Sequence, residues 1–564
     1  MSNSVHLISL LLLASGLSLH AQEKRAMTFD EMVGWERISE QRISDNGKWV
    51  FCKMEPWRGD ATILLYNDKG EEKDSFKPAT KAQFSSSSEY LLVTKTPPLK
   101  EVEAEMLKKT DKDKIPMNSL IISRLSGGME TIDSLKSYKL SETADWLAYQ
   151  RGSKKDSMLY IRSLDGMQQD SFPAVSDFGF AQKGNVLYVV SDSVLYTYIP
   201  QKGNNRISDK KGVFKKIAFN ENGSKLAYLF CSHKDSAATR SSLYLAENNT
   251  PGKLIAERGD KAFPASWIIS ENAPLYFSEN ASRLFFGTAP EPKQKDTTLL
   301  AENRSEERRV GKENRPDVQV WSWDEKVQYT QQSFNKATDL KRSYTAIYNL
   351  GSGRLLQLAT EELPTLQTAD EGNAIWALLS TTRPYGTQSM WTARQFHDIY
   401  MINLETGERR QIKEKSPSYM RFSPKGKYTY WYQDQDSSWY TRSMADGKEY
   451  RLTTPQTFAA WDEDNDVPDY PSPYGIAGWT DDDQSILIKD RYDIWKFDPI
   501  AASSPVNLTV NGRKEQITYS LIQLDREKRA YNTSEAQYLT GFNERTKGSG
   551  YYTTRLNKPV APKA

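Results

Sequence analysis

The densest group of side chains that could do chemistry lies late in the sequence. Four aspartates and one glutamate fall within eight residues, with no lysine or arginine between them: Asp462, Glu463, Asp464, Asp466 and Asp469. Alternating carboxylates can ligate Ca²⁺, but the glycine and the terminal glutamate of an EF-hand loop are missing. A calcium loop, a solvated acidic loop, and an acidic rim facing a substrate amine or a partner's arginine all remain open. We expect a binding rim without a metal.

The remaining sequence contains no recognisable catalytic group. Past residue 21 the only histidines are His233 and His397, and no second His or Cys accompanies either, which argues against zinc. The serines in 351–353 and 548–550 sit in Gly-Ser-Gly triplets, too short for the G-x-S-x-G nucleophile elbow. A phosphate-binding loop and a dinucleotide fingerprint are also missing. We therefore predict no catalytic residue and no cofactor in this chain.

A repeated strand–turn–strand element must position these residues, and residues 421–432 (RFSPKGKYTYWY) show it best. Proline and glycine favour the turn, and the alternating aromatics favour a half-buried strand. The pattern occurs nine times. The second positions of the copies are Ser44, Ser85, Ser141, Ala181, Asn220, Ser278, Ala369, Ser423 and Thr480.

A second strand ending in an Asp, Asn or Gly turn follows most copies, as in DIYMINLETG at 398–407. Most copies begin about 40 to 60 residues apart, a period typical of β-propeller blades, whereas a sandwich or simple barrel would lack it. The sequence therefore predicts an all-β fold, a propeller of four-stranded antiparallel blades that is incomplete at the C-terminus or ends there.

Composition and the N-terminus bound the class of protein. The 75 Lys and Arg residues nearly balance the 73 Asp and Glu residues, so the net charge of +2 gives no reason to expect nucleic acid or a membrane as a partner. Cys52 and Cys231 do not make a disulfide framework, and we expect buried free thiols. Residues 1–21 contain a short apolar run before His20-Ala21, although they lack an early Lys or Arg. We interpret them as a secretory signal, which predicts export and no transmembrane segment.

The remaining boundaries follow from this pattern. We expect a helical lead-in at 22–40, the propeller at 41–543, and either final strands or a linker at 544–564. Residues 99–114 are charge-rich and predicted to be helical. At 304–314 the sequence RSEERRVGKEN interrupts the pattern and resembles translated sequencing adapter, so we treat it as an artefactual insert; an exposed loop is the alternative.

The blade repeats resemble the N-terminal propellers of the S9 (prolyl oligopeptidase) family of serine peptidases. The stretches MTFDEMVGWERISEQRISDNGKWV, DVQVWSWDE and SPYGIAGWTDDDQSILIKDRYDIW are similar to the secreted form found in Bacteroidetes. That resemblance implies a propeller of seven or eight blades that covers a C-terminal α/β-hydrolase domain carrying Ser, Asp and His. None of these catalytic positions occurs in the chain. The paired glutamates with which dipeptidyl peptidases of this family hold a substrate amino terminus have no clear counterpart either.

Two functions from different classes remain open. The first is the substrate-gating propeller of an exported peptidase, truncated before its catalytic domain, in the periplasm or outside a Gram-negative cell. Its partners would be peptides or unfolded polypeptide segments and the missing hydrolase domain. The second is a non-catalytic periplasmic propeller that binds proteins or peptides in the manner of the translocation protein TolB. Under either, the chain alone is expected to cleave no peptide.

Overall fold

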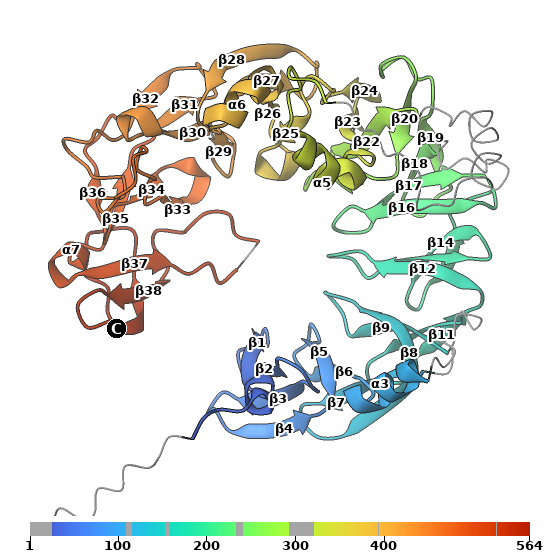
Figure 1. The fold of residues 1–564 in the computed structure, drawn as a ribbon. Coiled ribbons are helices and arrows are strands. Elements are labelled where there is room, and N and C mark those ends of the chain that lie inside the picture. Colours follow the sequence, from blue (N-terminus) through green and yellow to red (C-terminus); the bar gives the residue numbers. More distant parts are fainter. Residues whose placement is uncertain are drawn as a thin grey trace, which may run out of the picture. The chain divides into compact units, whose positions relative to one another are not determined.

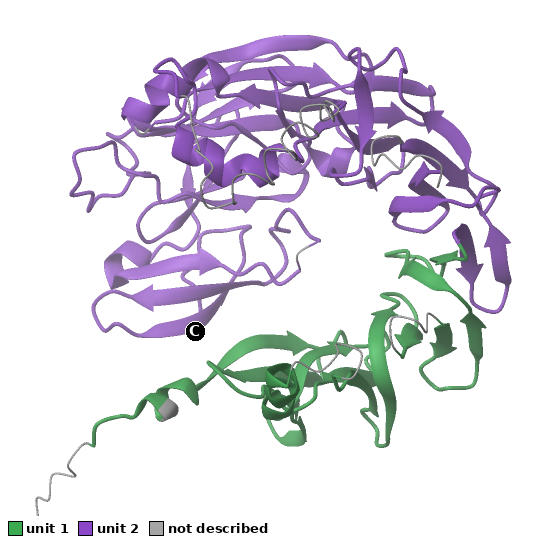
Figure 2. Ribbon diagram, turned by 45° about the vertical axis from the view of Figure 1, so that its right-hand side comes forward, with its two compact units in different colours: residues 1–192 green, residues 193–564 purple. Residues whose placement is uncertain are grey.

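The computed structural model describes residues 25–108, 115–152, 158–232, 241–292, 321–392, 394–525 and 527–564. The chain divides into two compact units, residues 1–192 and residues 193–564 (Figure 2). The predicted signal at 1–21, His233 and the suspected insert at 304–314 lie outside the described residues. Each unit is built almost entirely from antiparallel strands that follow one another in sequence (Figure 1).

Unit 1 contains a four-stranded sheet, a seven-stranded sheet and one further hairpin. The first sheet has the order β1 (Glu36–Ile43), β2 (Trp49–Pro56), β3 (Thr62–Asn67) and β4 (Glu72–Phe76). The second runs in order through β5 (Ala79–Phe84), β6 (Tyr90–Lys95), β7 (Asn118–Arg124), β8 (Met129–Leu140), β9 (Trp146–Arg151), β10 (Leu159–Ser163) and β11 (Gln169–Phe172). The hairpin pairs β12 (Val175–Phe180) with β13 (Leu187–Ser191).

The seven-stranded sheet is two blades that share one long strand. The first half of β8 pairs with β7 and its second half with β9, with Leu135 taking part in both pairings. The 12-residue length of β8 therefore explains why two sequence repeats merge into one sheet.

Unit 2 begins with the hairpin of β14 (Val194–Ile199) and β15 (Gly203–Arg206) and continues with six sheets. The first two contain β16 (Val213–Phe219), β17 (Lys225–Cys231), β18 (Ser242–Glu247) and β19 (Lys253–Ala256), then β20 (Trp267–Ser270), β21 (Tyr276–Phe277), β22 (Arg283–Pro290), β23 (Tyr344–Asn349) and β24 (Arg354–Gln357). The next two contain β25 (Thr365–Gln367), β26 (Trp376–Thr381), β27 (His397–Asn403) and β28 (Arg409–Ser416), then β29 (Arg421–Phe422), β30 (Tyr428–Gln433), β31 (Ser438–Ser443) and β32 (Glu449–Arg451). The last two contain β33 (Ile476–Trp479), β34 (Ile486–Lys489), β35 (Ile494–Phe497) and β36 (Val506–Asn507), then β37 (Ile517–Leu521), β38 (Gln537–Asn543) and β39 (Ser549–Thr554).

The repeated polar residue of the sequence pattern has a local structural role. Its side-chain oxygen accepts the backbone N–H five residues later, as Ser423 Oγ does from Tyr428 at 3.0 Å and Thr480 Oγ1 from Ser485 at 2.9 Å. The copies at Ser44, Ser85, Asn220 and Ser278 make the same bond. Because short polar side chains stabilise turns in this way, Ser, Thr and Asn recur at this position.

A polar side chain from the next sheet then caps each of several turns. Ser88 Oγ accepts the N–H of Asn46 at 3.2 Å in unit 1. In unit 2, Asn373 Oδ1 accepts the N–H of Asn280 at 3.0 Å, and the buried carboxylate of Asp483 accepts that of Lys425 at 3.1 Å. Neighbouring turns are thus joined by hydrogen bonds as well as by apolar packing.

Most cores lie between successive sheets, and one core of unit 1 lies between the two blades that the seven-stranded sheet joins. In unit 2 the largest core joins residues from β17 and β18, the sheet of β20–β24 and the strands β26 and β27. Further along, Tyr430 and Trp439 of one sheet pack with Trp479 and Ile486 of the next. Each sheet buries its apolar faces against its neighbours, as the sequence pattern predicted.

The connections of unit 2 fall on two edges, because successive antiparallel strands are joined alternately at opposite ends. On one edge lie the turns that join the first strand of each sheet to the second; we call it the turn edge. On the opposite edge lie the connections between second and third strands and the links from one sheet to the next; we call it the insert edge. The turn edge holds the 3₁₀ turns Asp370–Gly372 and Asp481–Asp483. The insert edge holds α5 (Tyr329–Asp339), α6 (Gly386–Thr392) and the 3₁₀ turn Asp434–Asp436.

The prediction of an all-β, multi-bladed propeller with four-stranded antiparallel blades is confirmed. Helix α3 (Leu99–Leu107) occupies the segment predicted to be helical, and α2 (Phe29–Val33) lies in the predicted lead-in. The boundary at residue 40 needs correction, because β1 already begins at Glu36. Among the described residues, no helix has the length and apolarity needed to cross a membrane.

Candidate functional site

The predicted acidic residues lie in one loop on the insert edge, between β32 and β33. The loop is closed at its base, where Asp462 N–H donates to the carbonyl of Ser472 at 2.8 Å and Tyr474 N–H donates to the carbonyl of Ala460 at 2.9 Å. We call residues 462–472 the acidic loop. Its tip is organised by Asn465, whose side-chain amide donates to the carbonyls of Val467 and Asp469 at 3.1 Å each.

Three arginines from other parts of unit 2 bind this loop. Arg491, between β34 and β35, forms an ion pair with Asp464 at 2.8 Å. Arg513, on the short helix α7 (Gly512–Glu515), pairs with Glu463 at 3.0 Å. Arg394, which follows α6, pairs with Asp469. Three of the five predicted acids are therefore neutralised by residues that lie far from them in the sequence.

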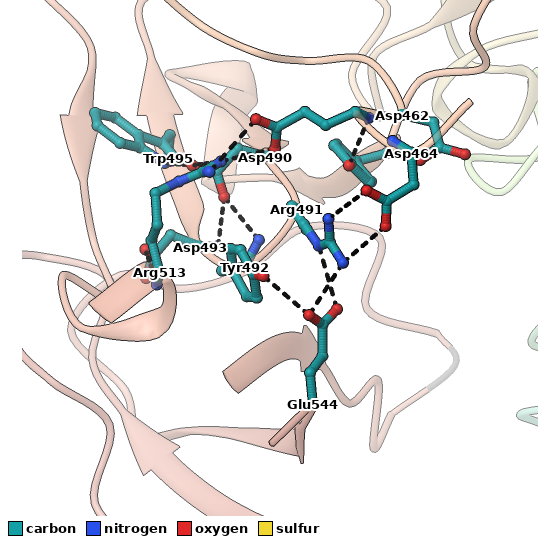
Figure 3. Close-up of polar contacts among 11 residues, drawn as sticks. Asp462, Asp464, Asp490, Arg491, Tyr492, Asp493, Trp495, Arg513 and Glu544 are labelled. Atoms are coloured by element: carbon teal, nitrogen blue, oxygen red, sulfur yellow. Dashed lines mark hydrogen bonds and ion pairs between the residues drawn. The ribbon is translucent and has the colours of Figure 1, made fainter. Parts of the chain in front are cut away.

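Arg491 is the centre of the largest polar network around the loop (Figure 3). It also pairs with Glu544 at 3.1 Å, and Tyr492 Oη donates to the same carboxylate at 2.9 Å. Burial opposes the shift, yet hydrogen bonds from Arg491 and Tyr492 hold the pKa of Glu544 below its usual value. Hydrogen bonds to Glu544 and Asp464 raise the pKa of Arg491, so the pair stays ionised.

Asp490 and Asp493 complete this network from the buried side (Figure 3). Asp490 accepts the indole N–H of Trp495 at 3.2 Å, and burial raises its pKa. Asp493 accepts the N–H groups of Gly512 and Arg513 at 2.9 and 3.1 Å, which caps the start of α7. The DRYDIW stretch thus builds the support to which the acidic loop is attached.

The acidic residues do not form a rim of unpaired carboxylates. Asp466 is the one predicted acid whose carboxylate makes no hydrogen bond or ion pair with a described residue, and the carboxylate of Asp462 accepts only the N–H of Asp464 among the described residues. Among the described residues, no three His, Cys, Asp or Glu side chains converge to form a metal site. Most of the acidic side chains of the loop are in ion pairs, because arginines reach the loop from three other segments of the chain.

We expect the Arg491→Met variant to loosen the acidic loop without unfolding unit 2. Removal of the guanidinium leaves Asp464 and Glu544 without their shared partner, and Arg394 and Arg513 still hold the other acids. Hydrogen–deuterium exchange should show the amides of residues 463–466 exchanging about tenfold faster.

Lys514→Met is the control, since Lys514 lies on α7 next to Arg513 but makes no ion pair with a described residue. Unchanged exchange in Arg491→Met would contradict the role of Arg491 in holding the loop.

A second candidate site, which we call the turn pocket, lies on the turn edge of unit 2. It is a cavity of about 350 Å³ formed by the first turns of four successive sheets and the loop between β37 and β38. Its lining residues are Glu279, Asp370, Glu371, Pro424, Lys425, Asp481, Asp482, Glu527, Lys528, Arg529, Ala530, Asn532 and Glu535. Seven acidic and three basic side chains leave this cavity with a net negative charge.

Ion pairs between neighbouring turns shape the pocket. Lys425 pairs with Asp370 at 2.8 Å, and Arg529 pairs with Glu371 at 2.5 Å. The hydrogen bond to Asp370 raises the pKa of Lys425, so this lysine stays charged. The carboxylate of Asp481 makes no ion pair with a described residue and contributes to the excess negative charge. Such a cavity favours a cationic group such as a peptide amino terminus.

The turn pocket was not predicted from the sequence, although the repeats contain a signal for it. Aligning the repeats places Glu279, Asp370 and Asp481 directly after the repeated polar or small residue, and Glu371 and Asp482 one position later. Acids recur at equivalent positions of separate blades. Equivalent turns of neighbouring blades lie side by side, so this recurrence predicts a shared acidic surface.

The other singled-out residues have structural surroundings. His397 packs edge-to-face on Tyr419 with ring centroids 5.7 Å apart, and burial lowers its pKa. Cys231 is buried and Cys52 is half-buried, and neither forms a disulfide with a described residue. Trp479 is buried and packs between sheets.

The blades define the class of protein, a multi-bladed β-propeller, with a charged pocket on one edge and a charged loop on the other. No protein-family model and no curated protein sequence matches the chain. Similar solved structures include a eukaryotic initiation factor, with 12% identity, a TM-score of 0.37, and coverage of 76% of this chain and 90% of the other.

Two peptidase structures are also similar. The propeller domain of the Trilobed protease from Pyrococcus furiosus shows 10% identity and a TM-score of 0.29, covering 68% of this chain and 99% of the other. The acylaminoacyl peptidase of Pyrococcus horikoshii shows 10% identity and a TM-score of 0.27, covering 73% of this chain and 58% of the other. At such low identities and TM-scores these similarities carry no argument, and the assignment of a propeller fold rests on the order and pairing of this chain's own strands.

Proposed function

We propose that this chain is the substrate-gating propeller of an exported S9-type serine peptidase. The observation that carries the proposal is the turn pocket, in which the first turns of successive blades surround one acid-rich cavity. A pocket of this size admits the end of a peptide or one basic side chain but not a folded domain. The repeat pattern and the DRYDIW block, which resemble S9 propellers, support the same assignment.

The turn pocket acts in this proposal by electrostatic selection. Its carboxylates attract a protonated amine, and Lys425 and Arg529 hold neighbouring turns in place. At exposed sites such attraction operates over roughly one Debye length, which is about 8 Å at 0.15 M salt. Peptides with a free amino terminus would therefore concentrate at this edge before they reach a catalytic domain.

We expect the Asp481→Asn/Asp482→Asn variant to bind free-amine peptides about five- to tenfold more weakly than the parent chain. Neutral amides keep the shape of the turn but remove two negative charges from the cavity. Fluorescence anisotropy with a C-terminally labelled peptide measures the affinity, and the N-acetylated peptide should be insensitive to the change.

Asp68→Asn provides a matched control, because Asp68 is an exposed aspartate of unit 1. Equal affinities of parent and double variant for the free-amine peptide, at low salt, would contradict a role of the turn pocket in peptide selection.

A peptidase role requires chemistry that the described residues do not supply. We expect purified residues 22–564 to cleave no peptide and to take up no serine-directed fluorophosphonate. The complete gene product should continue into a G-x-S-x-G sequence and be labelled. A stop codon directly after codon 564 would exclude this function and leave a peptide-binding propeller.

A further inference from the structure

A groove on the insert edge of unit 2 separates α6 from the tip of the acidic loop. It has a volume of about 780 Å³ and is lined by Thr392, Arg394, Phe396, Gln435, Val467, Pro468, Asp469 and Tyr470. The guanidinium of Arg394 lies 4.6 Å from the ring centroid of Tyr470 and donates to Asp434 at 2.8 Å. Arg394 thus joins two walls of the groove, one from the end of α6 and the segment that leads into β27, the other from the acidic loop.

The groove and its surroundings expose apolar side chains. Val467 and Tyr470 are 57% and 49% exposed, although both lie in a loop whose backbone is fixed by Asn465. Trp391, next to the lining residue Thr392, is 86% exposed. In the described part of unit 2, every exposed tryptophan lies on this edge: Trp321, Trp323 and Trp391. Concentrated exposed aromatics mark an interaction surface.

The surroundings of the groove are negative, although its lining contains one base, Arg394, and one acid, Asp469. The side chain of Asp469 is 60% exposed, so its carboxylate is accessible beside its ion pair with Arg394. Two more carboxylates adjoin the lining: Asp434, which pairs with Arg394, and Asp466, which is exposed and makes no ion pair with a described residue. In and around the groove three carboxylates therefore accompany one guanidinium, which favours a cation.

We propose that this groove binds an extended polypeptide segment in which lysine or arginine adjoins proline or leucine. Tyr470, Val467 and Pro468 pack against the apolar residue and the aliphatic stem of the basic one. The terminal cation shares Asp469 with Arg394, while Arg394 keeps its bond to Asp434. Aromatic-lined grooves suit extended, proline-containing chains because these lose little conformational entropy on binding.

Peptide binding by the groove rests on the proposed function only in that both take peptides as ligands. The groove lies on a different edge of unit 2 from the turn pocket. The turn pocket favours a free amino terminus, whereas the groove accepts an internal segment. Failure to find a catalytic domain would therefore leave the groove untouched.

The test uses the parent chain and a fluorescein-labelled octapeptide, N-acetylated and C-amidated, with alternating lysine and proline and one central leucine. Anisotropy at low salt should show saturable binding. Asp469→Asn and Tyr470→Ala should each weaken binding about tenfold. Asp68→Asn, at an exposed aspartate of unit 1 that lines neither the groove nor the turn pocket, should leave the affinity unchanged.

Two further peptides separate charge from shape. Replacing each lysine with glutamate should abolish binding, and replacing proline and leucine with glycine should weaken it about tenfold. Equal affinities of the parent, Asp469→Asn and Tyr470→Ala would overturn the proposal, as would preferential binding of the glutamate peptide. Thermal unfolding of each variant confirms that the blades remain folded.

Discussion

The Arg283→Met variant should lose about 3 to 5 kcal/mol of unfolding free energy, because one buried and two half-buried carbonyl groups lose their donor at about 1 to 3 kcal/mol each. Arg283 begins β22, and its side chain is only 6% exposed. One guanidinium nitrogen donates to the carbonyls of Gly372, Asn373 and Ala374 at 3.0, 2.7 and 3.1 Å. These carbonyls belong to the first turn of the next sheet, so Arg283 joins two blades.

Chemical denaturation followed by tryptophan fluorescence measures this effect. Arg410→Met is the control, since Arg410 is exposed and pairs only with its neighbour Glu408 in the described structure. Loss of an exposed pair of this kind costs about 0 to 1 kcal/mol. If Arg283→Met cost no more than Arg410→Met, the inter-blade role of Arg283 would be wrong.

The second large effect is expected at Asp483, which caps the turn of the preceding blade. Its carboxylate is buried and accepts the hydroxyl of Ser423 at 2.5 Å and the N–H groups of Lys425 and Lys427 at 3.1 and 3.2 Å. Alanine leaves these donors without an acceptor in a site that water does not reach. We expect Asp483→Ala to lower the unfolding free energy by about 3 kcal/mol.

Asp483→Asn distinguishes hydrogen bonding from simple packing. Asparagine has almost the same volume as aspartate but offers only one acceptor oxygen. The unfolding free energy of Asp483→Asn should therefore lie between those of the parent and Asp483→Ala. Asp482→Asn tests the adjacent, exposed carboxylate, which pairs with Lys427 at 2.6 Å, and should change stability by less than about 1 kcal/mol. Equal stabilities of the parent and Asp483→Ala would show that the inter-blade cap contributes nothing.

Both effects depend on side chains that act between blades, and the sequence pattern alone does not distinguish them. Asp483 resembles its neighbours Asp481 and Asp482 in sequence, yet it alone of the three is buried. Arg283 occupies a position that is Trp49, Tyr90 or Tyr428 in other copies of the repeat. Their roles follow from the turn of a different sheet lying within hydrogen-bond distance.

The all-β fold could be predicted from the sequence because the information is local. The hydroxyl of Ser423 and the N–H of Tyr428 are five residues apart, and alternating apolar residues define each strand without reference to the rest of the chain. Repetition then requires that equivalent sheets pack on one another. Helix α3 was predictable for the same reason. The first strand was expected only after residue 40, whereas β1 begins at Glu36.

Which charged side chains pair with one another at the candidate sites was decided by the tertiary structure. The sequence showed five acids without a nearby base, but Arg394, Arg491 and Arg513 reach them from three separate segments. The turn pocket likewise combines residues from 279 to 535. Sequence determined which side chains each blade carries and which edge they occupy. Only packing decided which charges meet, because electrostatic pairing depends on distance in space and not on separation along the chain.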